Sequence, residues 1–262
     1  MKKEDMYTTQ LQAGLGLIHE TRILLEMWRP GMSAGDLYKS ALHSGEFPNV
    51  SARRLRNIVV ECFAPRYLLE GGEPAQYLKQ LIKSLSTTEI MQLFFLYTSR
   101  ANLILADFIR DVYWERYAAG DDLVRNDDVK AFIQRGIDDG KTAKRWSEST
   151  VKRVASYLTG CCADYGLLGK RTLEGRRIVP FRVELRVAAF LAHDLHFSGL
   201  GDNTVTSHKD WELFGLTRDD VREEFKRLSL RGYFIHQSAG DVTHIGWKYK
   251  RMEEFIDVLA EG

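Results

Sequence analysis

Apolar residues recur with a helical period along most of the chain, and one signal opens a predicted helix three times. In each case an apolar residue and a hydroxyl residue precede the helix, and a second apolar residue follows four positions after the hydroxyl. The three sets are Val50-Ser51…Leu55, Trp146-Ser147…Val151 and Leu216-Thr217…Val221. The hydroxyl oxygen can accept a hydrogen bond from an N–H of the first turn, and the apolar pair can pack as a hydrophobic staple.

A shorter helix is predicted before each capped helix. The three shorter helices cover Ser33–Ser44, Asp127–Asp138 and Ser207–Phe214. A short helix, a tight connection and a well-capped longer helix form the plan of a helix-turn-helix. This order of elements indicates a nucleic-acid-binding protein.

The second and third capped helices are each followed by a predicted β-hairpin, which is how a winged helix ends. The four strands cover residues 167–173, 176–183, 233–235 and 242–245. Glu174-Gly175 is predicted to form the first turn, and Gly166 and Gly232 occupy equivalent places directly after the two helices. A final amphipathic helix is predicted over 249–259.

Further helices are predicted over Thr9–Trp28, from Ser51 to about Phe63, over 74–85 and from Thr88 to Tyr117. Pro65 should end or kink the second of these. The last contains an uninterrupted apolar run from Leu93 to Leu96. Because a helix that is apolar on most sides is normally buried, we expect it to be the spine of the molecule.

These elements predict a mainly α, multi-helical fold with helix-turn-helix or winged-helix units and short β-hairpins. Gly71-Gly72, with Pro74 close behind, is the clearest boundary. We therefore expect an N-terminal helix-turn-helix domain over 1–72. A helical spine with a winged-helix-like unit should follow over 73–183, and a second winged-helix-like unit over 184–262.

Charge is distributed unevenly in a chain whose formal net charge is only +1. Residues 141–186 contain eleven basic and four acidic side chains, an excess of seven positive charges. The excess falls on the approach to the second capped helix, its polar face and its hairpin, elements that can straddle phosphates in a winged helix.

The candidate nucleic-acid-binding residues are Arg53, Arg54, Arg56, Lys144, Arg145, Lys152, Arg153, Lys170, Arg171, Arg176 and Arg177. The first three lie in the early turns of a capped helix that no hairpin follows. A structural reading stays open for all of them, because charges on exposed helices often only solvate a surface. The acidic stretch Asp107–Asp128 could also pair with the basic one.

Catalytic, metal and membrane signals are weak. The chain has no phosphate-binding loop, no dinucleotide fingerprint and no nucleophile elbow, so we expect neither an enzyme nor a cofactor. The apolar stretch Ile90–Ile109 contains Arg100 and Asp107, which favours a buried helix over a membrane span. The three cysteines have no metal or disulfide spacing and suit a reducing cytoplasm. The N-terminus lacks the apolar core of a signal peptide.

Two near-motifs are interpreted as incidental. His193 and His196 have no convincing distant partners for zinc. Asp210 with Glu224-Phe225-Lys226 mimics the carboxylate and lysine set of a metal-dependent nuclease, but the second part falls within a predicted helix. No metal site is therefore predicted.

The N-terminal third resembles the BrxA proteins of BREX bacteriophage-defence systems. The residues that carry the resemblance are Gly14-Leu15-Gly16, Glu20-Thr21-Arg22, Trp28, Gly31-Met32-Ser33, the run Asn49–Leu55, and Arg66. The rest of the chain is similar in length and helix order. The resemblance implies a mostly helical, non-enzymatic cytoplasmic protein with winged-helix-like parts. It also implies DNA binding within a multi-protein system, and a likeness to RNA-binding antitermination folds. Our first hypothesis is a BREX component that binds double-stranded DNA mainly through phosphate contacts.

Two other functions stay open. An adaptor for other BREX proteins would use exposed aromatic residues such as Trp211, Tyr233 and Trp247, and a structured-RNA binder would prefer RNA hairpins to duplex DNA.

Overall fold

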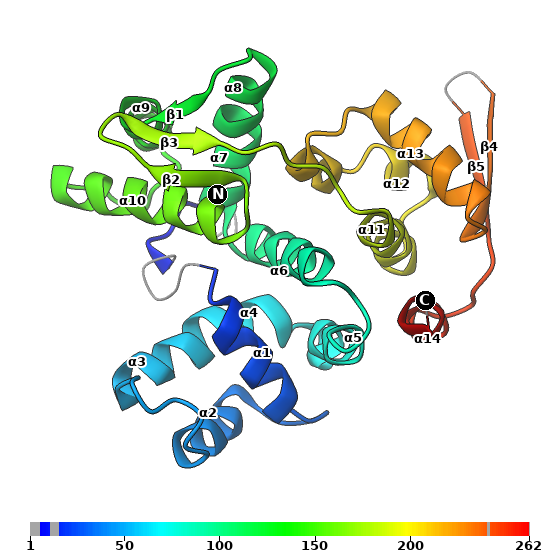
Figure 1. The fold of residues 1–262 in the computed structure, drawn as a ribbon, viewed down its shortest axis with the longest axis horizontal. Helices are drawn as coiled ribbons and strands as arrows, with labels where there is room; N and C mark the ends of the chain where they lie inside the picture. Colours follow the sequence, from blue (N-terminus) through cyan, green and yellow to red (C-terminus); the bar gives the residue numbers. More distant parts are fainter. Residues whose placement is uncertain (1–5, 11–15, 240–241, 262) are drawn as a thin grey trace. The chain divides into compact units, whose positions relative to one another are not determined.

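The structure is a computed structural model that describes residues 6–10, 16–239 and 242–261 (Figure 1). The described chain is mainly helical, as predicted. Its α-helices are α1 (Ile18–Met27), α2 (Ala34–His43), α3 (Ala52–Asn57), α4 (Ala64–Tyr67), α5 (Glu73–Leu81), α6 (Thr87–Ala101), α7 (Leu103–Phe108), α8 (Trp114–Ala118), α9 (Asn126–Asp138), α10 (Glu148–Asp164), α11 (Leu185–Phe197), α12 (Asp202–Thr206), α13 (Arg218–Leu230) and α14 (Met252–Glu261). Its strands are β1 (Leu123–Arg125), β2 (Leu168–Arg171), β3 (Gly175–Ile178), β4 (Phe234–Ala239) and β5 (Val242–Trp247). No helix among the described residues is long and apolar enough to span a membrane.

The chain forms two compact units, each built from two segments. The first unit contains residues 1–79 and 94–181, and the second contains 80–93 and 182–262. The break between Phe181 and Arg182 is close to the boundary predicted after residue 183. The segments predicted as 1–72 and 73–183 lie mostly in the first unit.

Hydroxyl caps begin four helices where the sequence predicts them. The Oγ atoms of Ser33, Ser51 and Ser147 accept from backbone N–H groups in the first turns of α2, α3 and α10. Thr217 forms a capping box with Asp220 at the start of α13. These bonds satisfy donors that a helix start otherwise leaves free.

Helix α1 begins at Ile18, so the prediction of a helix from Thr9 is wrong where the chain is described. Leu17 has a left-handed backbone with φ of 50°. The Gly16 N–H donates to Asp164 and its carbonyl accepts from Tyr165, which prevents both groups from joining a helix. Residues 11–15, including the predicted apolar positions Leu11 and Leu15, lie outside the described residues.

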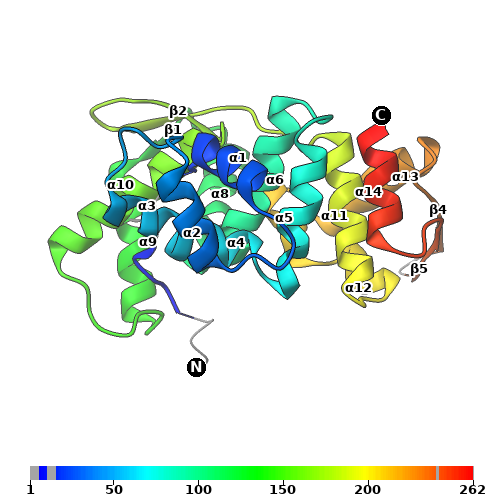
Figure 2. The ribbon, with the colours of Figure 1, turned by 90° about the horizontal axis from the view of Figure 1, so that it is seen from below.

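The predicted continuous helix from Thr88 to Tyr117 is interrupted. Asn102 has an extended backbone between α6 and α7, and a π-helical stretch over Ile109–Tyr113 separates α7 from α8. The helix that begins with α3 likewise passes through a π-helical stretch, Ile58–Phe63, and continues past Pro65 to Tyr67. It therefore does not end at the proline. Figures 1 and 2 show α1 to α4 gathered in one bundle.

The first unit contains a helix–helix–hairpin module, which we call the basic module (residues 123–178). Strands β2 and β3 form the predicted hairpin, and β1 adds a third strand in the order β1-β3-β2. Helices α9 and α10 pack against each other, and α10 also packs on β2. Strand β1 is not predicted from the sequence, because three residues are too few to show an alternating pattern.

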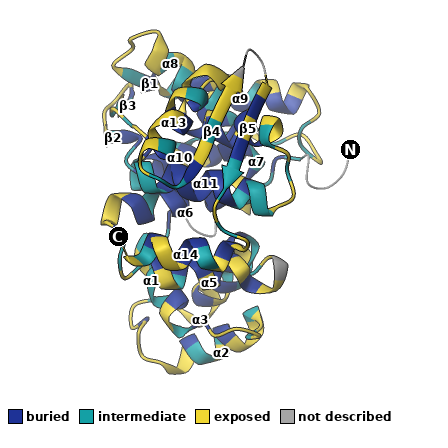
Figure 3. Cartoon of the chain, turned by 90° about the vertical axis from the view of Figure 1, so that its right-hand side faces the viewer, coloured by how far each residue is buried: buried dark blue, intermediate teal, exposed yellow. Residues whose placement is uncertain are grey.

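The second unit contains a related module, which we call the C-terminal module (residues 202–247). It consists of α12, a 3₁₀ helix over Lys209–Phe214, α13 and the two-stranded hairpin β4–β5. The 3₁₀ helix occupies the place where the sequence predicts a regular helix over 207–214. Buried and exposed residues alternate along β5, so the hairpin has one core face and one solvent face (Figure 3).

Candidate nucleic-acid interface

Helix α10 has a buried apolar side and an exposed polar side. Val154 and Leu158 are buried on one side. The stripe on the other side has the spacing of one helix face and consists of Ser149, Lys152, Arg153 and Ser156, all exposed. This confirms the predicted separation of Lys152 and Arg153 from the apolar positions. Lys152 lies 2.7 Å from Glu148, but both side chains are exposed, so water and salt weaken this pair.

The hairpin of the basic module brings further cations to the same part of the first unit. Strand β2 packs on α10 and runs back along it, so the turn lies toward the N-terminal half of the helix (Figure 1). Lys170, Arg171 and Arg177 are exposed on the two strands. The hairpin and the α10 stripe therefore lie in one module.

Arg176 differs from Arg177, because successive strand residues point to opposite faces. Arg176 pairs across the sheet with the fully buried Val124. Its side chain is half-buried, and Nη1 donates to the Gly169 carbonyl at 3.1 Å, next to a register shift in the hairpin. Arg176 therefore supports the hairpin from within, and the prediction that it is exposed to phosphate in the same way as Arg177 is corrected.

The turn consists of Leu173 and Glu174, and Gly175 is the first residue of β3, so the predicted Glu174-Gly175 turn is displaced by one residue. Thr172 N–H donates to the Gly175 carbonyl at 2.7 Å and closes the turn. A Cβ atom on Gly175 would lie 2.1 Å from the Val124 carbonyl oxygen. Close contact between β3 and β1, rather than turn geometry, thus requires this glycine.

Lys144 and Arg145 are exposed in the connection between α9 and α10. Arg145 lines a cleft of about 450 Å³ together with Lys130, Trp146 and Glu148, at the place where α10 begins on α9. These side chains extend the positive surface from the hairpin to the start of α10.

The acidic stretch does not neutralise these cations. Asp107 pairs with Lys141 at 2.9 Å and with Arg110 at 3.7 Å. Arg116 pairs with Asp121 and Asp128. Among the described residues, Lys152 is the one exposed candidate of the basic module that forms an ion pair.

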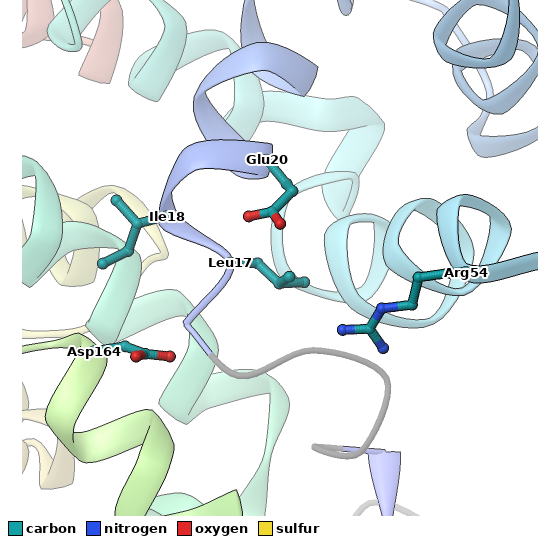
Figure 4. A pocket seen from close by; sticks show the side chains of 5 residues that line it. All are labelled: Leu17, Ile18, Glu20, Arg54 and Asp164. Atoms are coloured by element: carbon teal, nitrogen blue, oxygen red, sulfur yellow. The ribbon is translucent and has the colours of Figure 1, made fainter. Parts of the chain in front are cut away.

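The N-terminal candidates lie elsewhere in the first unit. Arg53, Arg54 and Arg56 are exposed on α3. Arg54 points into a cleft that Glu20 and Asp164 also line (Figure 4). Asp164 ends α10, about 16 Å along the helix axis from Arg153. Carboxylates would repel a phosphate in this cleft, so α3 does not extend the positive surface of the basic module.

Arg125 is a further cation of the basic module that is not among the residues predicted from the sequence. It ends β1, is exposed, and lies 2.9 Å from Glu174 in the hairpin turn. The only signal for it was the short run Leu123-Val124-Arg125 between acidic residues. Its charge offsets that of Glu174 at the tip of the hairpin.

The sequence profile of the BrxA family matches residues 5–194. The chain belongs to the BrxA family. Membership makes it a component of a BREX phage-defence system. The match covers the whole basic module and ends within α11, so the C-terminal module lies outside it. No curated protein matches the chain.

A solved structure shares the fold of this BrxA-family chain. It is the crystal structure of an uncharacterized protein from Magnetospirillum magneticum, with a TM-score of 0.56 and 20% sequence identity. The alignment covers 72% of this chain and 94% of the other. At this identity the likeness concerns the fold alone.

Residues that carry the BrxA resemblance form a buried junction in the first unit. The Gly16 carbonyl accepts from Tyr165 Oη at 3.0 Å and from Arg66 Nη1 at 3.5 Å, and its N–H donates to Asp164. A Cβ atom on Gly16 would lie 2.7 Å from the Asp164 Cβ. Burial raises the pKa of the Asp164 carboxyl. Gly16 and Arg66 therefore fasten the start of α1 to the end of α10.

The C-terminal module does not present the predicted aromatic surface. Trp211 is buried and its indole N–H donates to the Val205 carbonyl at 2.7 Å. Trp247 is half-buried and stacks on His196 with ring centroids 4.1 Å apart. Tyr233 is also half-buried. The prediction of exposed Trp211, Tyr233 and Trp247 is therefore wrong, because all three rings pack within the second unit.

The near-motifs of the second unit have structural partners. His193 is buried, shares a hydrogen bond with the Ala189 carbonyl and stacks on Phe255 at 3.6 Å. Burial lowers its pKa to about 3. Glu224 pairs with Arg227 in α13, and Phe225 is buried beside it. No three His, Cys, Asp or Glu residues in the described part of the chain are close enough to hold a metal ion.

Proposed function

We propose that the basic module binds duplex DNA through its phosphates within the BREX system, in a binding rather than a catalytic role. The observation that supports this is the set of exposed cations within one module: Lys144, Arg145, Lys152, Arg153, Lys170, Arg171 and Arg177. Lysine and arginine contacts to phosphate give affinity with little sequence preference, and this affinity falls steeply with salt.

The order of elements favours a winged-helix mode of binding. A strand, two helices and a hairpin follow one another in the basic module, and α10 presents Lys152 and Arg153 on its solvent face. In helix-turn-helix proteins the second helix enters the major groove. In our proposal α10 takes this place, and the hairpin with Arg177 contacts the adjacent backbone.

The test is a titration of a labelled duplex at several salt concentrations. The variant K152A/R153A/R177A removes three cations from the basic module. The matched control K226A/R227A/R231A removes three from the C-terminal module, so both variants change the net charge equally. We expect the basic-module variant to lower affinity about 100-fold near 0.15 M salt and to reduce the salt slope by about 0.9 for each lost contact.

The control should change affinity by less than about twofold. Equal losses in both variants would mean that net charge alone drives binding, and no loss in the first would exclude the basic module. If an RNA hairpin competes for the protein better than the duplex does, the ligand is structured RNA and not DNA.

A second candidate function is an adaptor role toward other BREX proteins through the C-terminal module. The observation that favours it is the solvent face of the β4–β5 hairpin, where Ile235 is 57% and Val242 is 63% exposed. A pull-down of BREX proteins that fails with I235S/V242S and survives K152A/R153A/R177A would support this role. Trp247 is unsuitable for the test, because its ring is part of the core.

A further inference from the structure

Leu173 is the most exposed large apolar residue that the structure describes. Its exposed fraction is 100%, and it stands at the turn between β2 and β3. An aliphatic side chain is stabilised when it leaves water. In this position Leu173 contributes nothing to the core of the first unit. Burial of this side chain against a ligand would therefore favour binding.

The fold holds the backbone of Leu173 in place. Asn126 Nδ2 donates to the Leu173 carbonyl at 3.1 Å, and the Asn126 backbone N–H donates to the Glu174 carbonyl at 2.8 Å. The Arg125–Glu174 ion pair lies beside these bonds. The turn is therefore fastened to the end of β1 and the start of α9. A fastened turn loses less conformational entropy on binding than a free loop.

Cations stand on both sides of this apolar tip. Lys170 and Arg171 precede the turn, Arg177 follows it, and all three are exposed. Glu174 is the one carboxylate in the turn, and the guanidinium of Arg125 lies 2.9 Å from it. An apolar residue between cations matches a groove that has phosphates on both rims and base pairs at its floor.

We propose that Leu173 is a wedge that the hairpin inserts into the minor groove of duplex DNA, where it partly unstacks one base step. The inference rests on the proposed function and specifies its ligand as duplex DNA that bends at the contacted step. Apolar wedges of this kind kink DNA toward the major groove. Steps that unstack easily, such as TA or a mismatch, should therefore bind better than stiff sequences.

The experiment measures binding and bending together. A duplex labelled at both ends for energy transfer is titrated in two forms, fully paired and with one central mismatch. The proteins are the wild type, L173A, L173M and the matched control L230A, since Leu230 is 88% exposed on α13 outside the basic module.

We expect the wild type to raise energy transfer and to prefer the mismatched duplex about tenfold. L173A should lose both effects while the salt slope of binding to paired DNA stays unchanged, and L173M and L230A should behave like the wild type. Binding without bending, or bending by L173A, would overturn the wedge and leave phosphate binding intact. A wild type that binds no duplex would overturn both proposals. If L173A bends DNA as the wild type does but no longer binds a BREX protein, Leu173 contacts a protein and not DNA.

Discussion

The basic module and the C-terminal module share a helix–hairpin plan but differ in how they use charge. In α13 the charged residues neutralise one another at neighbouring positions, as in the Arg222–Asp219, Lys226–Glu223 and Arg227–Glu224 pairs. In α10 the exposed Arg153 forms no ion pair with any described residue. The shared plan therefore fixes the path of the backbone, while the pattern of charge on the second helix decides which surface can attract a polyanion.

The two modules also complete their hairpins differently. In the basic module β1 pairs with β3 through its backbone. In the C-terminal module, side chains of α12 occupy the corresponding edge. Asp202 accepts from the Ile245 N–H at 2.8 Å, and Asn203 accepts from the Thr243 N–H at 3.0 Å. Side-chain oxygens therefore satisfy the free donors of β5, as a third strand would do.

The helix ends, by contrast, are alike. Gly166 and Gly232 both have left-handed backbones, with φ of 81° and 80°. After each glycine, the next N–H donates to a carbonyl five residues earlier, from Leu167 to Cys162 and from Tyr233 to Leu228. This is the bond of a Schellman motif, and it turns the chain toward the hairpin in both modules.

The largest expected difference between the modules concerns a glycine in each hairpin. Gly175→Ala would place a Cβ atom 2.1 Å from the Val124 carbonyl oxygen, against backbone that cannot move without breaking the β1–β3 pairing. We expect it to lower the free energy of unfolding by more than about 3 kcal/mol. Urea unfolding followed by circular dichroism measures this change.

The control is Gly246→Ala in β5, where the new Cβ atom would lie 3.3 Å from the Ile235 Cβ, so a shift of a few tenths of an ångström at the solvent face relieves the contact. Its effect should stay within about 1 kcal/mol. Similar losses for the two variants would show that β1 does not constrain Gly175 in solution.

The sequence predicted those parts of the fold that short-range chemistry decides. The hydroxyl caps at Ser51, Ser147 and Thr217 need only the first turn of their own helices, and these predictions are confirmed. The break at Asn102 between α6 and α7 has no such local signal. The apolar run on both sides of it fits one continuous helix equally well.

The candidate site was predictable as a charge distribution but not as a set of orientations. The excess of cations over 141–186 is visible in the sequence, whereas the opposite faces of Arg176 and Arg177 depend on the pairing of β3 with the missed strand β1. The exposure of Leu173 likewise depends on the turn starting one residue earlier than predicted. Trp247 looked like a surface residue because its partner His196 is distant in sequence.

The second expected difference concerns the edge of β5. Asp202→Ala removes acceptors from the Ile245 N–H and from the Trp247 indole N–H, which lies 3.0 Å away. Hydrogen bonds to charged groups contribute about 1.5–3 kcal/mol each, and the Asp202 side chain is 23% exposed, so we expect the low end for the two bonds together, a loss of about 3 kcal/mol for the second unit. Thermal unfolding followed by tryptophan fluorescence checks this value. Asn203→Ala removes one neutral bond and should cost about 1 kcal/mol. A larger loss for Asn203→Ala would contradict the idea that Asp202 replaces the third strand.

The smallest expected difference is a dependence on pH that arises in the second unit. Burial holds the pKa of His193 at about 3, and it also lowers the pKa values of His196 and His236 in the same unit. When the pH falls below the ordinary value of about 6.5, the unfolded histidine takes up a proton that the folded one refuses, so stability is lost between about pH 6.5 and pH 3. The loss from His193 alone should reach about 2 kcal/mol at pH 5. In the first unit, the raised pKa of Asp164 acts in the opposite direction, because folding favours its protonated form.

His193→Phe keeps a ring against Phe255 and removes the titration. Urea unfolding at pH 7 and pH 5 should therefore show a smaller difference for this variant than for the wild type. An unchanged difference would mean that His193 takes up its proton in the folded protein, and that the C-terminal half of this BrxA-family chain is no more sensitive to acid than the basic module.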